Sequence, residues 1–340
     1  MAEIMKELFF TGKFAVKARE AAIPGQLSPS QMLVKNEYSM LSPGTELALF
    51  TGTHVGFSDP EITWCQYPIK AGYSSVGVVS AAGKEAPFAV GEGVLHYQPH
   101  ADYSVVDAVK DITRPLPPDL PDRKLALFAR FGQIAFTALP ASRNSGAVLI
   151  FGGGLIGNLC AQLFQTRVGR QVILADISEA RIKTAEKCGL KYRINSSKEN
   201  LKEALCRITA GRGVDTVVEA TGVPAIVSES LEQVNRYGEV ILLSSTRGKA
   251  EVDVYKLIHR KVTSLIGAHE LRYPLFPQGD SKNNHQDFSD RVLEGLCSGS
   301  IKAEPFITDI IPYTRVQEAY NWLLNDRDNH LGVIIDWKGV

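Results

Sequence analysis

The chain has 340 residues, of which 44% are hydrophobic and 22% are charged, and its formal net charge at pH 7 is zero. This length allows two domains, each with its own core. The balanced charge argues against general binding of nucleic acid or of an anionic membrane surface, because both need an excess of Lys and Arg.

The beginning of the chain and its cysteines indicate a cellular compartment. Residues 1–7 lack the basic and apolar regions of a signal peptide. The five cysteines contain no C-x-x-C pair, which excludes a disulfide framework and a cysteine-rich zinc lobe. We therefore expect a cytoplasmic protein with no membrane partner, in which Cys160, Cys188 and Cys206 are buried thiols of apolar helices.

Residues 1 to about 120 are predicted to be rich in β-strands. Short apolar runs such as 75–79 and 103–106 are separated by Gly, Pro and Ser, and no long helical pattern interrupts them. The proline-rich stretch 114–121 indicates a boundary between segments.

From about residue 147, strands and helices alternate. Ser178 is placed to cap a helix that runs to Gly189, and another helix is predicted to end at Gly238. Strands are predicted at 147–151, 171–175, 192–194, 214–219, 239–243 and 263–266, and helices after 155, after 178, at 198–210 and at 224–237. Six alternating strands predict a doubly wound parallel sheet. The tail is expected to contain a strand at 306–311, a helix at 315–325 and a strand at 332–337.

The first predicted strand of this sheet opens directly into a glycine-rich loop, G-G-G-L-I-G at 152–157, that begins a helix. Gly152 allows a tight turn, Gly154 lets the backbone approach a pyrophosphate, and Gly157 lets the helix pack close to the strand. This arrangement predicts a dinucleotide site that includes Leu155 and Ile156. The alternative is a structural glycine turn, because a lone G-x-G-x-x-G is weak evidence.

An acidic residue follows the second predicted strand. Asp176 lies 19 residues after Gly157, where a carboxylate accepts from the ribose 2′-hydroxyl of NAD. We expect Ile177 to contact the cofactor as well. Arg181 is an argument against selection of NAD over NADP, because a nearby Arg can bind the 2′-phosphate of NADP.

The β-rich beginning, the central dinucleotide fold and the C-terminal return together resemble the medium-chain dehydrogenase/reductase superfamily. The resemblance implies a GroES-like catalytic domain of residues 1–125, completed by 300–340, and a Rossmann domain of 126–299. It implies an active site between them, hydride transfer at the nicotinamide, and cofactor contacts from the loops after the later strands (Ala220, Thr221, Ser244, Ser245 and Gly267). We also expect a homodimer or homotetramer.

The zinc-binding motifs of the superfamily are altered in this chain. Where zinc-dependent members have Cys-x-Thr/Ser-Asp, the chain has 43–46, P-G-T-E, and where they have Gly-His-Glu it has 72–74, G-Y-S. The third ligand position falls at Ala129 or Arg130. No thiolate, imidazole or carboxylate occupies these places, so we expect no metal.

Two of these segments indicate a branch of the superfamily. Residues 41–47, L-S-P-G-T-E-L, together with 72–74, resemble the bacteriochlorophyllide dehydrogenases and related sugar or polyol dehydrogenases. This resemblance rests on two short motifs and fixes no substrate.

Without a metal, side chains must handle the proton of the substrate oxygen. Thr45 matches the hydroxyl relay position of the superfamily, with a simple turn residue as the alternative. Tyr73 replaces the histidine ligand and is either a phenolic proton donor or an aromatic plug. His100 and His269 are further acid/base candidates, with His269 on the Rossmann side of the cleft, and His54 lies in a loop that could cover it.

Two cationic residues near these motifs have structural alternatives. Arg130 supplies a fixed positive charge, although we favour an ion pair between Arg130 and Glu46. Lys70 would lower the pKa of Tyr73 if it were close, but an exposed lysine is the simpler expectation.

The expected function is a zinc-independent NAD(H) oxidoreductase that interconverts a secondary alcohol and a ketone, with a small sugar, polyol or cyclitol derivative as substrate. One alternative is an NAD(P)H-dependent reductase of C=C bonds in enones or quinones. The other is a cofactor-binding protein without catalytic activity.

Overall fold

The computed structural model describes residues 4–166 and 170–339. Residues 1–3, which belong to the segment that lacks the features of a signal peptide, lie outside the described residues. The chain divides into two units, Met1–Arg130 with Phe306–Val340, and Phe131–Pro305. The resemblance to the medium-chain superfamily implies boundaries near residues 125 and 300. In the described ranges, no helix is long and apolar enough to cross a membrane.

The first unit is built mainly from β-strands. The two sheets have the orders β2-β1-β4 and β15-β16-β3-β5-β6-β8, with β7 also paired to β3. The strands are β1 (Ile4–Gly12), β2 (Ala15–Ala22), β3 (Gln31–Met40), β4 (Ile69–Lys70), β5 (Ser75–Ala82), β6 (Gly93–His96), β7 (Tyr103–Asp107), β8 (Thr113–Pro115), β15 (Ile307–Pro312) and β16 (Gly332–Asp336).

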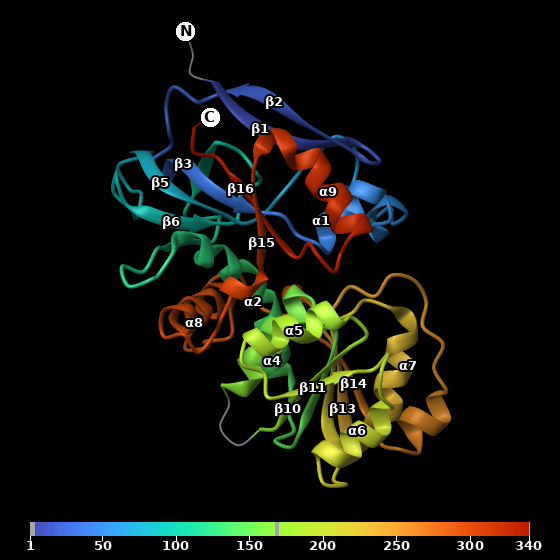
Figure 1. Cartoon of the computed structure of the whole chain (residues 1–340). Helices are drawn as coiled ribbons and strands as arrows, with labels where there is room; N and C mark the ends of the chain where they lie inside the picture. Colours follow the sequence, from blue (N-terminus) through green and yellow to red (C-terminus); the bar gives the residue numbers. More distant parts are fainter. Residues whose placement is uncertain (1–3, 167–169, 340) are drawn as a thin grey trace. The chain divides into compact units, whose positions relative to one another are not determined.

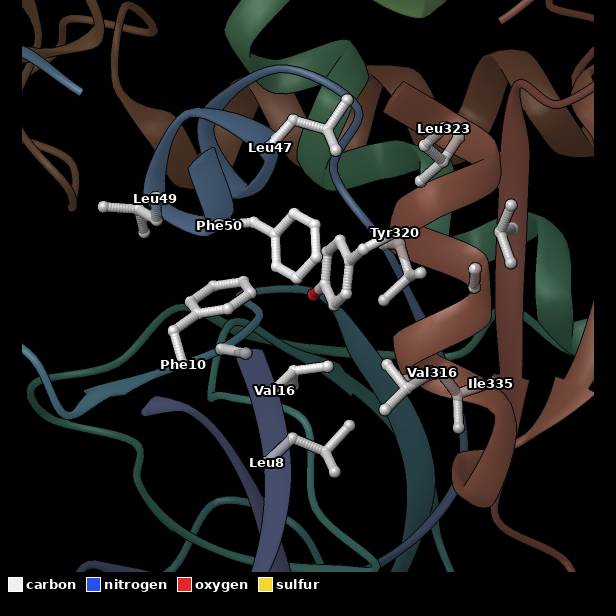
Figure 2. Close-up of a cluster of buried hydrophobic side chains, with 14 of the residues drawn as sticks. Leu8, Phe10, Val16, Leu47, Leu49, Phe50, Val316, Tyr320, Leu323 and Ile335 are labelled. Atoms are coloured by element: carbon white, nitrogen blue, oxygen red, sulfur yellow. The ribbon is translucent and has the colours of Figure 1, made fainter. Parts of the chain in front are cut away.

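The end of the chain completes this unit. Strand β16 pairs antiparallel with β3, and β15 pairs parallel with β16. Between them lies α9 (Val316–Asn325), which packs against α1 (Thr45–Thr51) (Figure 1). A core of aromatic and aliphatic side chains from both ends of the chain joins these elements; Figure 2 shows Phe10, Phe50 and Tyr320 at its centre.

The second unit contains a parallel sheet of six strands in the order β11-β10-β9-β12-β13-β14. This order reverses direction beside β9, as it does in a doubly wound sheet. The strands are β9 (Val148–Phe151), β10 (Val172–Asp176), β11 (Tyr192–Asn195), β12 (Val214–Glu219), β13 (Val234–Leu242) and β14 (Ser264–Gly267). The predicted fold class is confirmed.

The helices of this part of the chain are α2 (Leu127–Phe136, in which the division between the units falls), α3 (Ala138–Ala141), α4 (Leu155–Gln165), α5 (Glu179–Lys187), α6 (Leu201–Ile208), α7 (Pro224–Gln233) and α8 (His285–Cys297). Short helical turns occur at Val55–Phe57, Arg123–Ala126, Val254–His259, Glu270–Arg272, Glu304–Phe306 and Tyr313–Arg315. The side chain of Ser178 caps α5 as expected by accepting from the N–H of Arg181.

Two local expectations were wrong. The helix predicted at 224–237 ends at Gln233, because Val234 already pairs with Val214 in the parallel sheet before a register shift. Cys206 is exposed rather than buried, because α6 turns Ala204 and Leu205 inward and leaves Cys206 on its outer face. Cys160 and Cys188 are buried as expected.

Candidate active site

The glycine loop connects β9 to α4, and two of its positions, Gly152 and Gly157, require glycine. Gly152 has a φ of 101°, in the region that side chains rarely adopt. A Cβ on Gly157 would lie 2.0 Å from the carbonyl oxygen of Gly152. A Cβ on Gly154 would meet nothing within 4 Å, so the backbone there borders open space. Gly154 is also the N-cap of α4 and carries no capping side chain. This end of the helix can therefore receive an anion.

The carboxylate of Asp176 is fixed at the end of the neighbouring strand. Its Oδ2 accepts from the N–H of Gly153 at 2.6 Å, and its Oδ1 accepts from the N–H of Ser178 at 2.7 Å. Asp176 thus ties the glycine loop to the start of α5. Each oxygen keeps a second acceptor direction for a sugar hydroxyl.

The neighbours of Asp176 also belong to this end of the sheet. Ile177 is 73% exposed, so its side chain is available to an apolar ligand face. A Cβ on Gly153 would lie 3.0 Å from the Cβ of Arg181, which places Arg181 next to the loop. The structure therefore places an acidic and a basic side chain together beside the glycine loop.

A buried carboxylate organises the loops after β12 and β13, and sequence reasoning missed it. Glu219 is fully buried at the end of β12. Its Oε1 accepts from the N–H groups of Thr221 at 2.6 Å and Gly222 at 3.0 Å and from the Thr221 hydroxyl, while its Oε2 accepts from the hydroxyl of Ser244. An acid that ends a buried strand is the signal that could have identified it.

The other predicted cofactor residues follow the strands at the same edge of the sheet. Ala220 and Ser245 adjoin the residues that Glu219 holds, and Gly267 ends β14. A Cβ on Gly267 would meet nothing within 4 Å. Parallel sheets bind ligands beyond the carboxyl ends of their strands, so these positions suit a cofactor.

In the first unit, the predicted catalytic hydroxyls lie together. The hydroxyl of Tyr73 donates to Oγ of Ser42, and the side chain of Thr45, the first residue of α1, also hydrogen-bonds to Tyr73. Burial and then the charge of Glu46 raise the pKa of Tyr73 to about 12, against the opposing effect of the Arg130 cation. Tyr73 is thus a phenol rather than a phenolate at neutral pH.

Arg130 lies against aromatic rings. Its guanidinium carbon is 5.0 Å from the ring centre of Tyr73 and 5.0 Å from that of Tyr97. Such contacts are favourable cation–π interactions. The partners that the structure gives for the Glu46 carboxylate are Ser42, His100 and Tyr320, and the Arg130–Glu46 ion pair stays a prediction.

His100 lies in the loop before β7 and is fully buried. Its Nε2 lies 3.2 Å from Oε2 of Glu46. The same oxygen accepts from the hydroxyl of Tyr320. The sequence offers no local signal for Tyr320, because it lies 274 positions from Glu46 and reaches it only through the docking of α9.

The remaining candidates occupy turns or the surface. His269 is exposed and caps a short helix, with its Nδ1 accepting from the N–H of Leu271 at 3.1 Å. The Nδ1 of His54 accepts from the N–H of Gly56 at 3.1 Å. Lys70 forms an exposed ion pair with Glu7 rather than approaching Tyr73. That Thr45 and Tyr73 face His269 across a cleft stays a prediction.

Within residues 4–166 and 170–339, no group of three or more His, Cys, Asp and Glu side chains is placed to hold a metal ion. At the positions of the zinc motifs, the side chains are Pro43, Tyr73, Ala129 and Arg130. A proline, a phenol, a methyl group and a guanidinium are a poor donor set for zinc.

A family model described as zinc-binding dehydrogenase matches residues 156–279. That range lies within the second unit and contains none of the positions of the zinc motifs. The L-threonine 3-dehydrogenase of Shewanella baltica (strain OS185) is 32% identical over 170 residues, which cover 50% of this chain and 49% of the relative. The L-threonine 3-dehydrogenase of Paraburkholderia phytofirmans is 29% identical over 255 residues, covering 74% of this chain and 68% of the relative. The chain thus spans about half the length of the first of these relatives.

Solved structures match nearly the whole chain. L-idonate 5-dehydrogenase of Escherichia coli K-12 has a TM-score of 0.80, 18% identity and coverage of 99% of both chains. A structure described as a short chain alcohol dehydrogenase of E. coli CFT073, complexed with NADH, has a TM-score of 0.79, 20% identity and coverage of 98% of this chain and 99% of that chain. A Sinorhizobium meliloti 1021 protein bound to NADP has a TM-score of 0.78 with the same identity and coverage. The chain has the fold of the medium-chain dehydrogenases.

Proposed function

We propose that the chain is a zinc-independent, NAD(H)-dependent oxidoreductase that interconverts a secondary alcohol and a ketone. The observation that carries this proposal is the loop from Gly152 to Gly157, with Asp176 hydrogen-bonded to Gly153 at the reversal point of the parallel sheet. The open space beside Gly154 and the uncapped start of α4 fit a pyrophosphate. Two relatives of the chain are named L-threonine 3-dehydrogenase, and this similarity also favours a dehydrogenase activity.

The loop residues Gly152, Gly154, Leu155, Ile156 and Gly157 would hold the cofactor pyrophosphate. Asp176 would bind the adenosine ribose and favour NAD over NADP, with Ile177 and Arg181 beside it. Glu219 would hold Thr221 and Ser244 in place along the same edge.

In the proposed mechanism, the chain positions the substrate oxygen and handles its proton, while the bound nicotinamide supplies hydride transfer. Tyr73 donates its proton to the carbonyl oxygen in the reducing direction. Its raised pKa keeps that proton available at neutral pH. Ser42 and Thr45 orient the hydroxyl, and Arg130 lies over the ring. His100 and His269 remain candidates for the onward movement of the proton.

Zinc independence is part of the proposal. It rests on the donor set, because Pro43, Tyr73 and Arg130 occupy the positions of the zinc motifs. The Tyr73 phenol would then stabilise the substrate oxygen by donating a hydrogen bond and a proton, in place of a Lewis acid.

The proposed substrate class is a sugar, polyol or cyclitol derivative. The two motifs at 41–47 and 72–74 favour it, and several proteins of similar fold are named for hydroxylated substrates, such as galactitol 1-phosphate and L-idonate. The cytoplasmic location and an assembly of two or four copies stay predictions.

The test is NADH consumption with a panel of oxidised sugars, keto-polyols and cyclitol ketones, compared with enones and quinones. Turnover of the ketones supports the proposal. Turnover of the enones alone would establish the C=C reductase instead. Tight NADH binding without turnover of either class would favour a cofactor-binding protein that lacks activity.

A further inference from the structure

Glu46 is a fully buried carboxylate that the proposed mechanism does not use. It is 1% exposed and lies in the first turn of α1. Its Oε1 accepts from the N–H of Ser42 at 3.2 Å, and its Oε2 accepts from Nε2 of His100 and from the hydroxyl of Tyr320. Burying a carboxylate is costly unless hydrogen bonds compensate it. Here the donors come from three separate parts of the chain.

The Tyr320 ring is held independently of its hydroxyl. It stacks on Phe50 at 5.2 Å and meets the edge of Phe10 at 5.1 Å (Figure 2). Burial and the Glu46 charge keep the pKa of Tyr320 well above its ordinary value, so its hydroxyl is a proton donor to Glu46. A phenylalanine would keep the packing and remove this single hydrogen bond.

His100 contributes a donor of a defined tautomer. Its ring fills the space beside Gly72, where a Cβ would lie 2.4 Å from it. Its Nδ1 is buried and has no hydrogen-bond partner among the described residues. A neutral ring with its proton on Nε2 donates to Glu46 and leaves only a lone pair unpartnered, whereas an imidazolium would bury an unsatisfied N–H.

Ser42 connects this cluster to the phenol of Tyr73. Its N–H donates to Glu46, and its Oγ accepts the Tyr73 hydroxyl. The charged and titratable groups that act on Tyr73 are Glu46 from α1 and the Arg130 cation from α2. Tyr320 from α9 binds Glu46 and is also electrostatically coupled to Tyr73, and His100 from the segment before β7 binds Glu46.

We propose that Glu46, fixed by Tyr320 and His100, is a positioning residue whose negative charge holds the Tyr73 phenol in its protonated, donating form. The inference deepens the proposed function, because it rests on Tyr73 as the proton donor. It adds Glu46 as the group that keeps Tyr73 protonated. A negative charge beside a hydroxyl opposes its ionisation. The donating form of the site therefore persists into the alkaline range.

The experiment follows the ionisation of Tyr73 in the absence of cofactor and substrate. The full chain is labelled with ¹³C at the oxygen-bearing carbon of tyrosine, and its NMR signals are recorded from pH 8 to 11.5. The Tyr73→Phe variant assigns the signal. In the unsubstituted protein the Tyr73 signal stays that of a phenol up to about pH 11, as expected for a pKa of about 12. In Glu46→Gln the midpoint falls below that of the unsubstituted protein, while burial, the larger cause, still opposes ionisation.

Tyr320→Phe is the second variant, and it keeps the aromatic packing. It leaves the Glu46 carboxylate charged, so its Tyr73 midpoint stays above that of Glu46→Gln, which separates the effect of the charge from that of the hydrogen bond. Glu37→Gln, which removes the partner of Arg123 elsewhere in the unit, is the matched control and leaves the Tyr73 midpoint unchanged. Circular dichroism at each pH confirms that the variants are folded, and if Glu46→Gln does not fold, Glu46→Leu, which is also uncharged and of similar size, takes its place.

An ordinary Tyr73 midpoint near pH 10 in the unsubstituted protein would overturn the proposal. A Tyr73 midpoint that is unchanged when Glu46 is replaced by an uncharged side chain in a folded variant would do the same. Neither result depends on turnover. A failed search for a substrate would therefore count against the oxidoreductase function alone.

Discussion

The carboxylate of Asp176 accepts a hydrogen bond of 2.6 Å from the N–H of Gly153, a residue 23 positions earlier in the chain. Asp176, which should select the cofactor, therefore also holds the glycine loop in place. The same loop should bind the cofactor pyrophosphate. Selection and affinity are coupled at this residue.

The first prediction concerns the choice of cofactor. Asp176→Ala should reduce the preference for NADH over NADPH by a few kcal/mol, about the value of two charge-assisted hydrogen bonds. Because Asp176 also holds Gly153 and Ser178, the variant should bind both cofactors more weakly. Fluorescence titrations with NADH and NADPH measure both effects, and Arg181→Ala serves as the comparison. Equal affinities of the unsubstituted protein for NADH and NADPH would contradict the assignment.

The glycine loop allows a matched pair of substitutions. Gly157→Ala should destabilise the fold by about 1–3 kcal/mol, because its Cβ would lie 2.0 Å from the Gly152 carbonyl oxygen. Gly154→Ala should leave the unfolding free energy nearly unchanged, because its Cβ enters open space. It should nevertheless weaken NADH binding, since that space is the proposed pyrophosphate site. Denaturant unfolding and NADH titration test the pair, and normal NADH affinity in Gly154→Ala would remove the pyrophosphate from this position.

The third prediction concerns Tyr73. Tyr73→Phe keeps the ring beneath Arg130 and removes the donated proton, so carbonyl reduction should slow by roughly 10²–10⁴-fold with little change in cofactor affinity. A donor must be protonated, and Tyr73 is protonated below its pKa of about 12. Tyr73 should therefore cause no loss of the reduction rate as the pH rises from 7 to 10. A nearly normal rate in the variant would identify Tyr73 as an aromatic plug.

The elements that sequence alone predicts well are those with local signals. The apolar run into Gly152 and the cap at Ser178 depend on residues within a few positions of each other, and both are present in the structure. The predicted end of the helix at 224–237 is wrong, because Val234 pairs with Val214 in the sheet and this pairing overrides the helical pattern. The contact between Tyr320 and Glu46 cannot be predicted from local sequence, because only tertiary packing brings the two residues together.

The measurement that tests the proposal most directly is the zinc content of the protein together with its turnover, on one preparation purified without added metal. Elemental analysis should find zinc far below one atom per chain, and NADH oxidation with a ketone substrate should be unchanged by chelators. The side chains at the zinc motifs, Pro43, Tyr73 and Arg130, are the reason for this expectation. One zinc per chain, with turnover lost on its removal and restored on its return, would contradict it.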